Sequence, residues 1–307
     1  MNGAVRLGAY VLGLIVLFGG ALGVGRVVGP ANPDAPGAEE VSAEAGAHGH
    51  GDGGHGAGAE AGAPGGLQVS EGGYTLNTLT TAVTGQPMDF RFSVIGPDAR
   101  PVTEYQVKHE KKMHFVVASR DLTSFQHVHP EMSADGTWTV KLTLPKAGTY
   151  RAFADFVPQG GEKLTLGADL QAPGDFRPEP LPHASRTAMV DDYTVNLAGN
   201  LVPGRSSKLT LTVSRNGEPV SDLQPYLGAF GHLVALRAGD LAYVHVHPEE
   251  NGEAGPEITF YAEVPSGGDY RLFLDFKHDD KVRTASFTVP ATLSDGHVPS
   301  ATHDHTH

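Results

Sequence analysis

Short runs of alternating apolar and polar residues fill the chain from about residue 67 to residue 290. Segment 90–94, Phe-Arg-Phe-Ser-Val, has the period of two that is typical of a strand with one buried face. Clusters of Gly, Pro, Asn and Asp separate such runs, and no stretch sustains a helical apolar period. The pattern predicts an all-β fold, in which about seven short strands per repeat form an antiparallel, immunoglobulin-like β-sandwich.

The strand pattern occurs twice. Segment 148–156, Gly-Thr-Tyr-Arg-Ala-Phe-Ala-Asp-Phe, recurs as segment 268–276, Gly-Asp-Tyr-Arg-Leu-Phe-Leu-Asp-Phe. A repeat of this length indicates a tandem domain duplication rather than a solenoid. We therefore predict one β-sandwich over residues 67–173 and a second over residues 181–290, joined by a Pro-rich stretch.

The N-terminal segment carries a different signal. Residues 7–25 are uncharged and apolar, which is about the length that a membrane-spanning helix needs. This run is longer than the apolar core of a usual signal peptide. We predict that residues 1–29 are a single-pass anchor in the cell membrane, with the bulk of the chain extracytoplasmic. Cleavage of this segment, which would release a secreted protein, is the alternative.

Two segments outside the predicted sandwiches are expected to be disordered. Residues 30–66 are rich in Gly, Ala, Pro and Glu and contain no aromatic residue, so they offer little apolar surface to bury. Residues 291–307 form a His-rich tail, and the linker also contains several histidines. Short His-rich tracts commonly bind metal, although drift in composition explains them as well.

Composition narrows the chemistry. The chain has 35 acidic and 22 basic residues, a balance that argues against a nucleic-acid partner. It has no cysteine, so nitrogen, oxygen or methionine sulfur would have to hold any metal.

Three histidines recur at one spacing in both repeats. In each, a lone histidine lies 13 residues before a His-x-His-Pro motif. The two motif histidines share a strand face, and a turn near residues 120–121 or 237–240 would bring the lone histidine opposite them. Imidazole is the commonest protein ligand of metals such as copper and zinc. The candidate ligands are His114, His127 and His129 in the first repeat and His232, His245 and His247 in the second.

A fourth ligand could be a water molecule or an aspartate of the repeated strand, Asp155 in the first repeat and Asp275 in the second. The alternative for Asp155 is a structural ion pair with Arg151, which shares its strand face. His109 and His278 have no counterpart in the other repeat, and we interpret them as peripheral.

Segments 112–117 and 125–130, and their counterparts 226–234 and 243–248, resemble a family of secreted or membrane-anchored bacterial proteins, common in actinobacteria, that is labelled heavy-metal-binding. The resemblance covers residues 67–290 and leaves out the anchor and the tails. It implies an extracytoplasmic location and a heavy metal as ligand, and it implies no mechanism.

The leading hypothesis is a non-enzymatic, membrane-anchored protein that sequesters or delivers a copper or zinc ion through two three-histidine sites. Its partners would be metal ions and the membrane, with the protein partner unknown. The alternative is a structural or interaction β-sandwich module on the cell surface with no metal role. A metalloenzyme is disfavoured, because Glu131 and Glu249 are the only candidates for a general base and no nucleophile motif is present.

Overall fold

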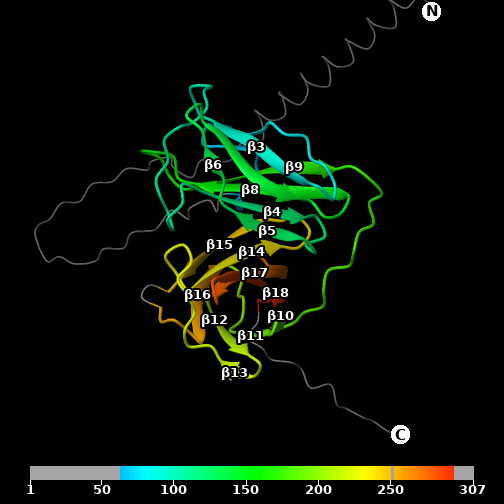
Figure 1. Cartoon of the computed structure of the whole chain (residues 1–307), viewed down its shortest axis with the longest axis vertical. Coiled ribbons are helices and arrows are strands. Elements are labelled where there is room, and N and C mark those ends of the chain that lie inside the picture. Colours follow the sequence, from blue (N-terminus) through cyan, green and yellow to red (C-terminus); the bar gives the residue numbers. More distant parts are fainter. Residues whose placement is uncertain (1–62, 250–251, 294–307) are drawn as a thin grey trace, which may run out of the picture. The chain divides into compact units, whose positions relative to one another are not determined.

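Two immunoglobulin-like β-sandwiches follow one another along the chain in the computed structural model, which describes residues 63–249 and 252–293 (Figure 1). Within this described part, no helix has the length and apolar character needed to cross a membrane. The predicted anchor (1–29), nearly all of the predicted linker (30–66) and most of the predicted tail (291–307) lie outside it.

The first repeat, drawn in cyan and green in Figure 1, consists of two antiparallel sheets. One has the strand order β1-β2-β3-β7-β6 and the other the order β5-β4-β8-β9. The strands are β1 (Ser70–Glu71), β2 (Tyr74–Thr78), β3 (Pro87–Ile95), β4 (Met113–Ser119), β5 (Phe125–Val128), β6 (Glu131–Met132), β7 (Thr137–Thr143), β8 (Gly148–Phe156) and β9 (Leu164–Ala172).

The second repeat has the same strand succession, but one strand joins its two sheets. The order is β10-β11-β12-β16-β15-β14-β17-β18, because β15 pairs with β14 at its start and with β16 further on. The strands are β10 (Thr187–Val190), β11 (Tyr193–Ala198), β12 (Ser206–Arg215), β13 (Glu218–Pro219), β14 (Gly231–Arg237), β15 (Tyr243–Pro248), β16 (Glu257–Glu263), β17 (Gly268–His278) and β18 (Lys281–Ala291).

Period-two alternation builds a separate core in each repeat. On β4, Met113, Phe115 and Val117 point into the first sandwich, where Phe92 stacks on Phe115 at 4.4 Å between ring centroids. Tyr150 lies in the same core, and its hydroxyl donates to the Lys146 carbonyl at 3.0 Å. Tyr270 makes the corresponding bond in the second repeat, an arrangement like the tyrosine corner of immunoglobulin folds.

The opposite faces of β4, β8, β14 and β17 are buried as well, because the two repeats pack against each other there. Phe125 of β5 stacks on Phe273 of β17, with ring centroids 3.9 Å apart and planes 5° apart. The remaining buried members of this inter-repeat cluster are Val116, Ala118, Leu122 and Phe153 from the first repeat and Val234, Leu236 and Leu241 from the second. These strands are therefore buried on both faces. On the outward faces, apolar positions such as Val116 and Phe153 form a third core between the repeats, and charged residues such as Arg151 and Asp275 are buried beside it.

The folded region starts slightly before the predicted boundary. The Gly66 amide donates to the Thr165 carbonyl at 2.7 Å, and the Arg151 guanidinium donates to the Gly66 carbonyl at 2.7 Å. A Cβ added at Gly167 would lie 2.0 Å from that carbonyl oxygen, so only glycine fits beneath it. The disordered linker predicted for 30–66 is therefore wrong for its last residues.

Candidate metal site

The first His hairpin folds as its sequence predicts. Strands β4 and β5 pair antiparallel around a turn at Arg120, with Val116 opposite His127 and Phe115 opposite Val128. Continuing this register by one residue places His114 opposite His129. Because Val128 packs against the core of the first sandwich, His127 and His129 project to the other side of the hairpin.

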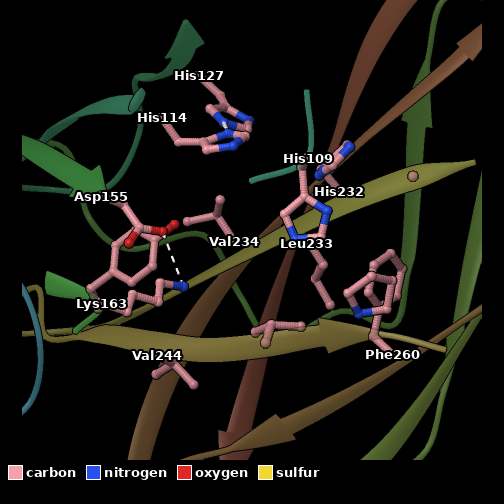
Figure 2. A pocket seen from close by; sticks show the side chains of 14 residues that line it. His109, His114, His127, Asp155, Lys163, His232, Leu233, Val234, Val244 and Phe260 are labelled. Atoms are coloured by element: carbon pink, nitrogen blue, oxygen red, sulfur yellow. Dashed lines mark hydrogen bonds and ion pairs between the residues drawn. The ribbon is translucent and has the colours of Figure 1, made fainter. Parts of the chain in front are cut away.

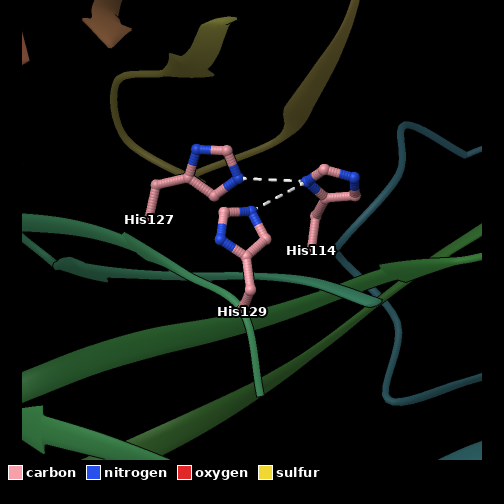
Figure 3. A group of neighbouring side chains, drawn as sticks. All are labelled: His114, His127 and His129. Carbon is pink, nitrogen blue, oxygen red and sulfur yellow. Dashed lines mark hydrogen bonds between the residues drawn. The ribbon is translucent and has the colours of Figure 1, made fainter. Parts of the chain in front are cut away.

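The three imidazoles converge on one point (Figure 3). The Nδ1 atom of His114 lies 3.3 Å from Nε2 of His127 and 3.3 Å from Nε2 of His129. One nitrogen of each ring lies within 4.8 Å of the other two. In the described part of the chain, no other group of three or more His, Asp or Glu side chains meets this criterion.

Each ring has a near nitrogen, which faces the other two rings, and a far nitrogen, which points away from them. In two of the rings the far nitrogen makes a hydrogen bond. Nε2 of His114 lies 3.1 Å from the Lys108 carbonyl oxygen, and Nδ1 of His127 lies 2.8 Å from a carboxylate oxygen of Asp275. Both acceptors require a proton on the far nitrogen. In the neutral rings, the near nitrogens of His114 and His127 therefore carry lone pairs.

Two lone pairs that face each other at 3.3 Å do not form a hydrogen bond. His129 can place a proton on its own Nε2 and donate it to His114 Nδ1, but the lone pair of His127 Nε2 then has no donor within the triad. A cation at the centre would accept all three lone pairs. The three near nitrogens are thus placed so that they could hold a cation, and the bonds to the Lys108 carbonyl and to Asp275 fix the orientations of the His114 and His127 rings.

The surroundings keep two of the rings neutral. Burial lowers the pKa of His114 to about 3, and the neighbouring His127 lowers it as well, while the bond to the Lys108 carbonyl acts in the opposite direction. Burial also lowers the pKa of His129 to about 3, with contributions from His127 and His114. A neutral imidazole is the form that binds a metal, so these rings need to release no proton near pH 7.

A cavity of about 60 Å³ adjoins the triad and draws its walls from both repeats (Figure 2). It is lined by His114 and His127 from the first repeat and by His232 from the second. His109 also lines it, with its ring centroid 6.0 Å from that of His114 and 5.6 Å from that of His232. The interpretation of His109 as peripheral is therefore wrong.

His109 has no counterpart in the second repeat, so the repeated histidine spacing does not identify it. No sequence pattern marks it; its place in the cavity follows from the loop in which the Lys108 carbonyl contacts the His114 ring. His278 does lie elsewhere: its ring contacts the Tyr193 hydroxyl at 2.7 Å and Asp222 at 3.1 Å.

The two aspartates differ in their surroundings. Asp275 accepts from Nδ1 of His127, so it lies behind that ring and outside the group of converging atoms. Asp155 lines the cavity and pairs with Lys163 at 3.2 Å. Burial raises the pKa of Asp155, and Lys163 opposes this rise.

The proposed Arg151–Asp155 ion pair is wrong. The guanidinium of Arg151 instead binds Asp169 at 2.7 Å and donates to the carbonyl oxygens of Gly66 and Leu67. Asp155 instead pairs with Lys163 and accepts a hydrogen bond from the Thr165 hydroxyl at 3.2 Å.

The second hairpin reproduces part of the arrangement. Nε2 of His232 lies 2.8 Å from the Tyr226 carbonyl oxygen, which repeats the bond between His114 and Lys108. His247 is exposed on β15, and the side chain of His245 lies outside the described structure. The proposed second ligand set of His232, His245 and His247 therefore stays a prediction.

Several solved structures show a distant likeness to this chain, with low sequence identity and low TM-scores. The adhesin FdeC of Escherichia coli is 15% identical over 76% of this chain and 66% of its own, with a TM-score of 0.25. InvD of Yersinia pseudotuberculosis is also 15% identical, over 76% of this chain and 61% of its own, with a TM-score of 0.25. Invasin, a bacterial integrin-binding protein, is 11% identical over 72% of this chain and 39% of its own, with a TM-score of 0.22. The chain thus spans less than two thirds of each of these.

No curated protein matches the chain. One family model matches it twice, over residues 68–173 and 188–292, which together are more than half of its length. These two matches coincide with the two sandwiches. The chain therefore belongs to the family described as "Domain of unknown function (DUF8832)", and it carries that domain as a tandem repeat.

Proposed function

We propose that this protein binds a copper or zinc ion through His114, His127 and His129, and that it sequesters or delivers this metal outside the cytoplasm. The observation that carries the proposal is the convergence of three ring nitrogens, two of whose separations are 3.3 Å. Metal–nitrogen bonds of about 2.0–2.1 Å in a tetrahedral site require about 3.3–3.4 Å between ligand atoms.

The supports behind the rings strengthen the proposal. Ligating histidines usually donate their other N–H group to a carboxylate or a backbone carbonyl, which fixes the ring and raises its basicity. His127 has such a partner in Asp275, and His114 has one in the Lys108 carbonyl. Three ligands leave one position of a tetrahedron open for a water molecule or another ligand.

Metal titration of the whole purified chain tests the proposal. Cu(II) and Zn(II) affinities are measured by competition with a chelator, so that weak binding by the His-rich segments is outcompeted. We expect His127→Ala and His129→Ala to abolish the tightest site. His183→Ala, at an exposed position away from the cavity, is the matched control and should leave it intact. Equal affinity of all variants would exclude the triad as the site.

The second candidate function is a structural or interaction module on the cell surface without a metal role. The observation that favours it is the contact between His127 and Asp275, because this buried pair joins the two repeats and accounts for the burial of both side chains without any ion. This candidate predicts that His127→Ala lowers the melting temperature in metal-free buffer and that added metal does not raise the melting temperature of the unaltered chain. A metal-dependent rise that His129→Ala removes would count against it.

A further inference from the structure

A second, larger pocket of about 330 Å³ lies beside the histidine triad. It shares His109, His114, Asp155, Lys163 and Val246 with the smaller cavity, so the two adjoin each other. The proposed metal site therefore borders on a space large enough for a small ligand as well as the ion.

The charge of this pocket is opposite to that of the whole chain. The chain has a net charge of −13, yet the pocket is lined by four lysines and a single acidic residue, Asp155. Lys163 pairs with Asp155. Among the described residues, no carboxylate oxygen lies within 4.0 Å of the ammonium groups of Lys108, Lys111 or Lys112, which are exposed. Three of the four lysines at the pocket thus have no carboxylate partner among the residues that the structure describes.

A divalent ion on the triad would add to this positive potential. Its three ligands are neutral imidazoles, and the carboxylate of Asp275 supplies one negative charge behind His127. An anion in the pocket would offset both the lysines and the ion, so the metal and an anion should bind more tightly together than apart.

We propose that this pocket binds a small organic carboxylate, held by Lys108, Lys111 and Lys112, and that carboxylate and metal bind cooperatively. The proposal rests on the metal site proposed above and names the class of its co-ligand. A carboxylate rather than inorganic phosphate is favoured by the apolar part of the wall, Phe156, Val157 and Val246, which suits a short carbon skeleton.

Equilibrium dialysis of the whole chain against carbon-labelled malonate tests the proposal, with and without one equivalent of Zn(II) previously bound to the protein. We expect zinc to tighten malonate retention by about tenfold or more. The combined variant Lys108→Gln, Lys111→Gln, Lys112→Gln should lose this gain. It keeps the Lys108 carbonyl that holds His114, and its zinc affinity without malonate should be unchanged or higher.

The control variant removes the same charge elsewhere. It combines Lys141→Gln, Lys146→Gln and Lys208→Gln, at exposed positions that do not line the pocket. This variant should retain malonate as the unaltered chain does. Equal loss in both variants, or equal retention of inorganic phosphate, would overturn the proposal. If zinc binds through the triad and malonate retention does not respond to it, only this inference fails. If His127→Ala leaves zinc binding unchanged, the metal site itself fails.

Discussion

His127 and Asp275 belong to different repeats, yet their side chains meet at 2.8 Å and are only 4% and 6% exposed. Two residues earlier on the same strands, Phe125 stacks on Phe273. Since residues i and i+2 share a strand face, β5 and β17 face each other through these two successive contacts. The orientation of a candidate ligand in the first repeat is therefore set by the second repeat.

This contact makes Asp275 a positioning residue for the proposed metal site. Asp275→Asn keeps the shape but weakens the acceptor, so the His127 ring loses basicity and its fixed orientation. We expect metal affinity to fall by about 10- to 100-fold, the range typical for the loss of a residue that hydrogen-bonds to a metal ligand. Competition titration measures this change. Asp222→Asn, which alters the partner of the remote His278, is the control, and an equal fall there would refute the role of Asp275.

The stacked pair predicts the strength of the contact between the repeats. Phe125→Ala and Phe273→Ala should each lower the free energy of unfolding by about 3 kcal/mol, because each leaves a hole between the sheets. The two effects should not add, and the coupling should be about 0.5–1.5 kcal/mol for an aromatic pair. Denaturant unfolding of both single variants and the double variant measures the coupling. Strict additivity would mean that the repeats do not depend on this stack.

The parts of the site that follow from local strand geometry could be predicted from sequence. Strand parity placed His127 and His129 on one face, and the turn at Arg120 brought His114 opposite them. The face between the repeats was not predicted, because period two says which residues share a face and not what covers it. A signal was present in Phe115-Val116-Val117-Ala118, an unbroken apolar run of the kind that a strand buried on both faces carries.

The roles of the aspartates depended on that missed face. Strand position put Asp155 and Asp275 near the histidines, which the structure agrees with, but it could not distinguish a direct ligand from a support behind a ring. The partners Lys163 and Asp169 come from β9 and the residues just before it, and no repeat pattern marks them. The partners in such charged pairs depend on three-dimensional packing, which the spacing of residues along the chain does not reveal.

The lowered pKa values predict how stability depends on pH without metal. The pKa of His114 is about 3 and that of His232 about 4 in the folded chain, against about 6.5 in the unfolded chain. Between these limits the unfolded state binds more protons, so stability is complete above pH 6.5 and falls as the pH drops toward 4. Each ring contributes up to about 1.4 kcal/mol per pH unit. Denaturant unfolding from pH 7 to pH 4 measures this slope, which His114→Gln should make shallower. An unchanged slope in that variant would contradict the assignment.

The repeat-related pair His114 and His232 offers the sharpest test of which hairpin holds the metal. Both rings donate to a carbonyl six residues earlier, so alanine removes the same local bond at either position. Only His114 belongs to the group of converging nitrogens in the described structure. We expect His114→Ala to remove the tightest site and His232→Ala to leave its affinity within about threefold, a change of less than 1 kcal/mol.

Zinc and copper titrations of these two variants, under one buffer and one competing chelator, measure the difference. The His232→Ala variant also controls for loss of a buried imidazole near the cavity, because its ring lies 6.4 Å from that of His114 between centroids. If both substitutions weaken binding alike, the ion is shared across the repeats, and the site includes His232 as a fourth imidazole. If only His232→Ala weakens it, the second hairpin holds the metal and the first is a support.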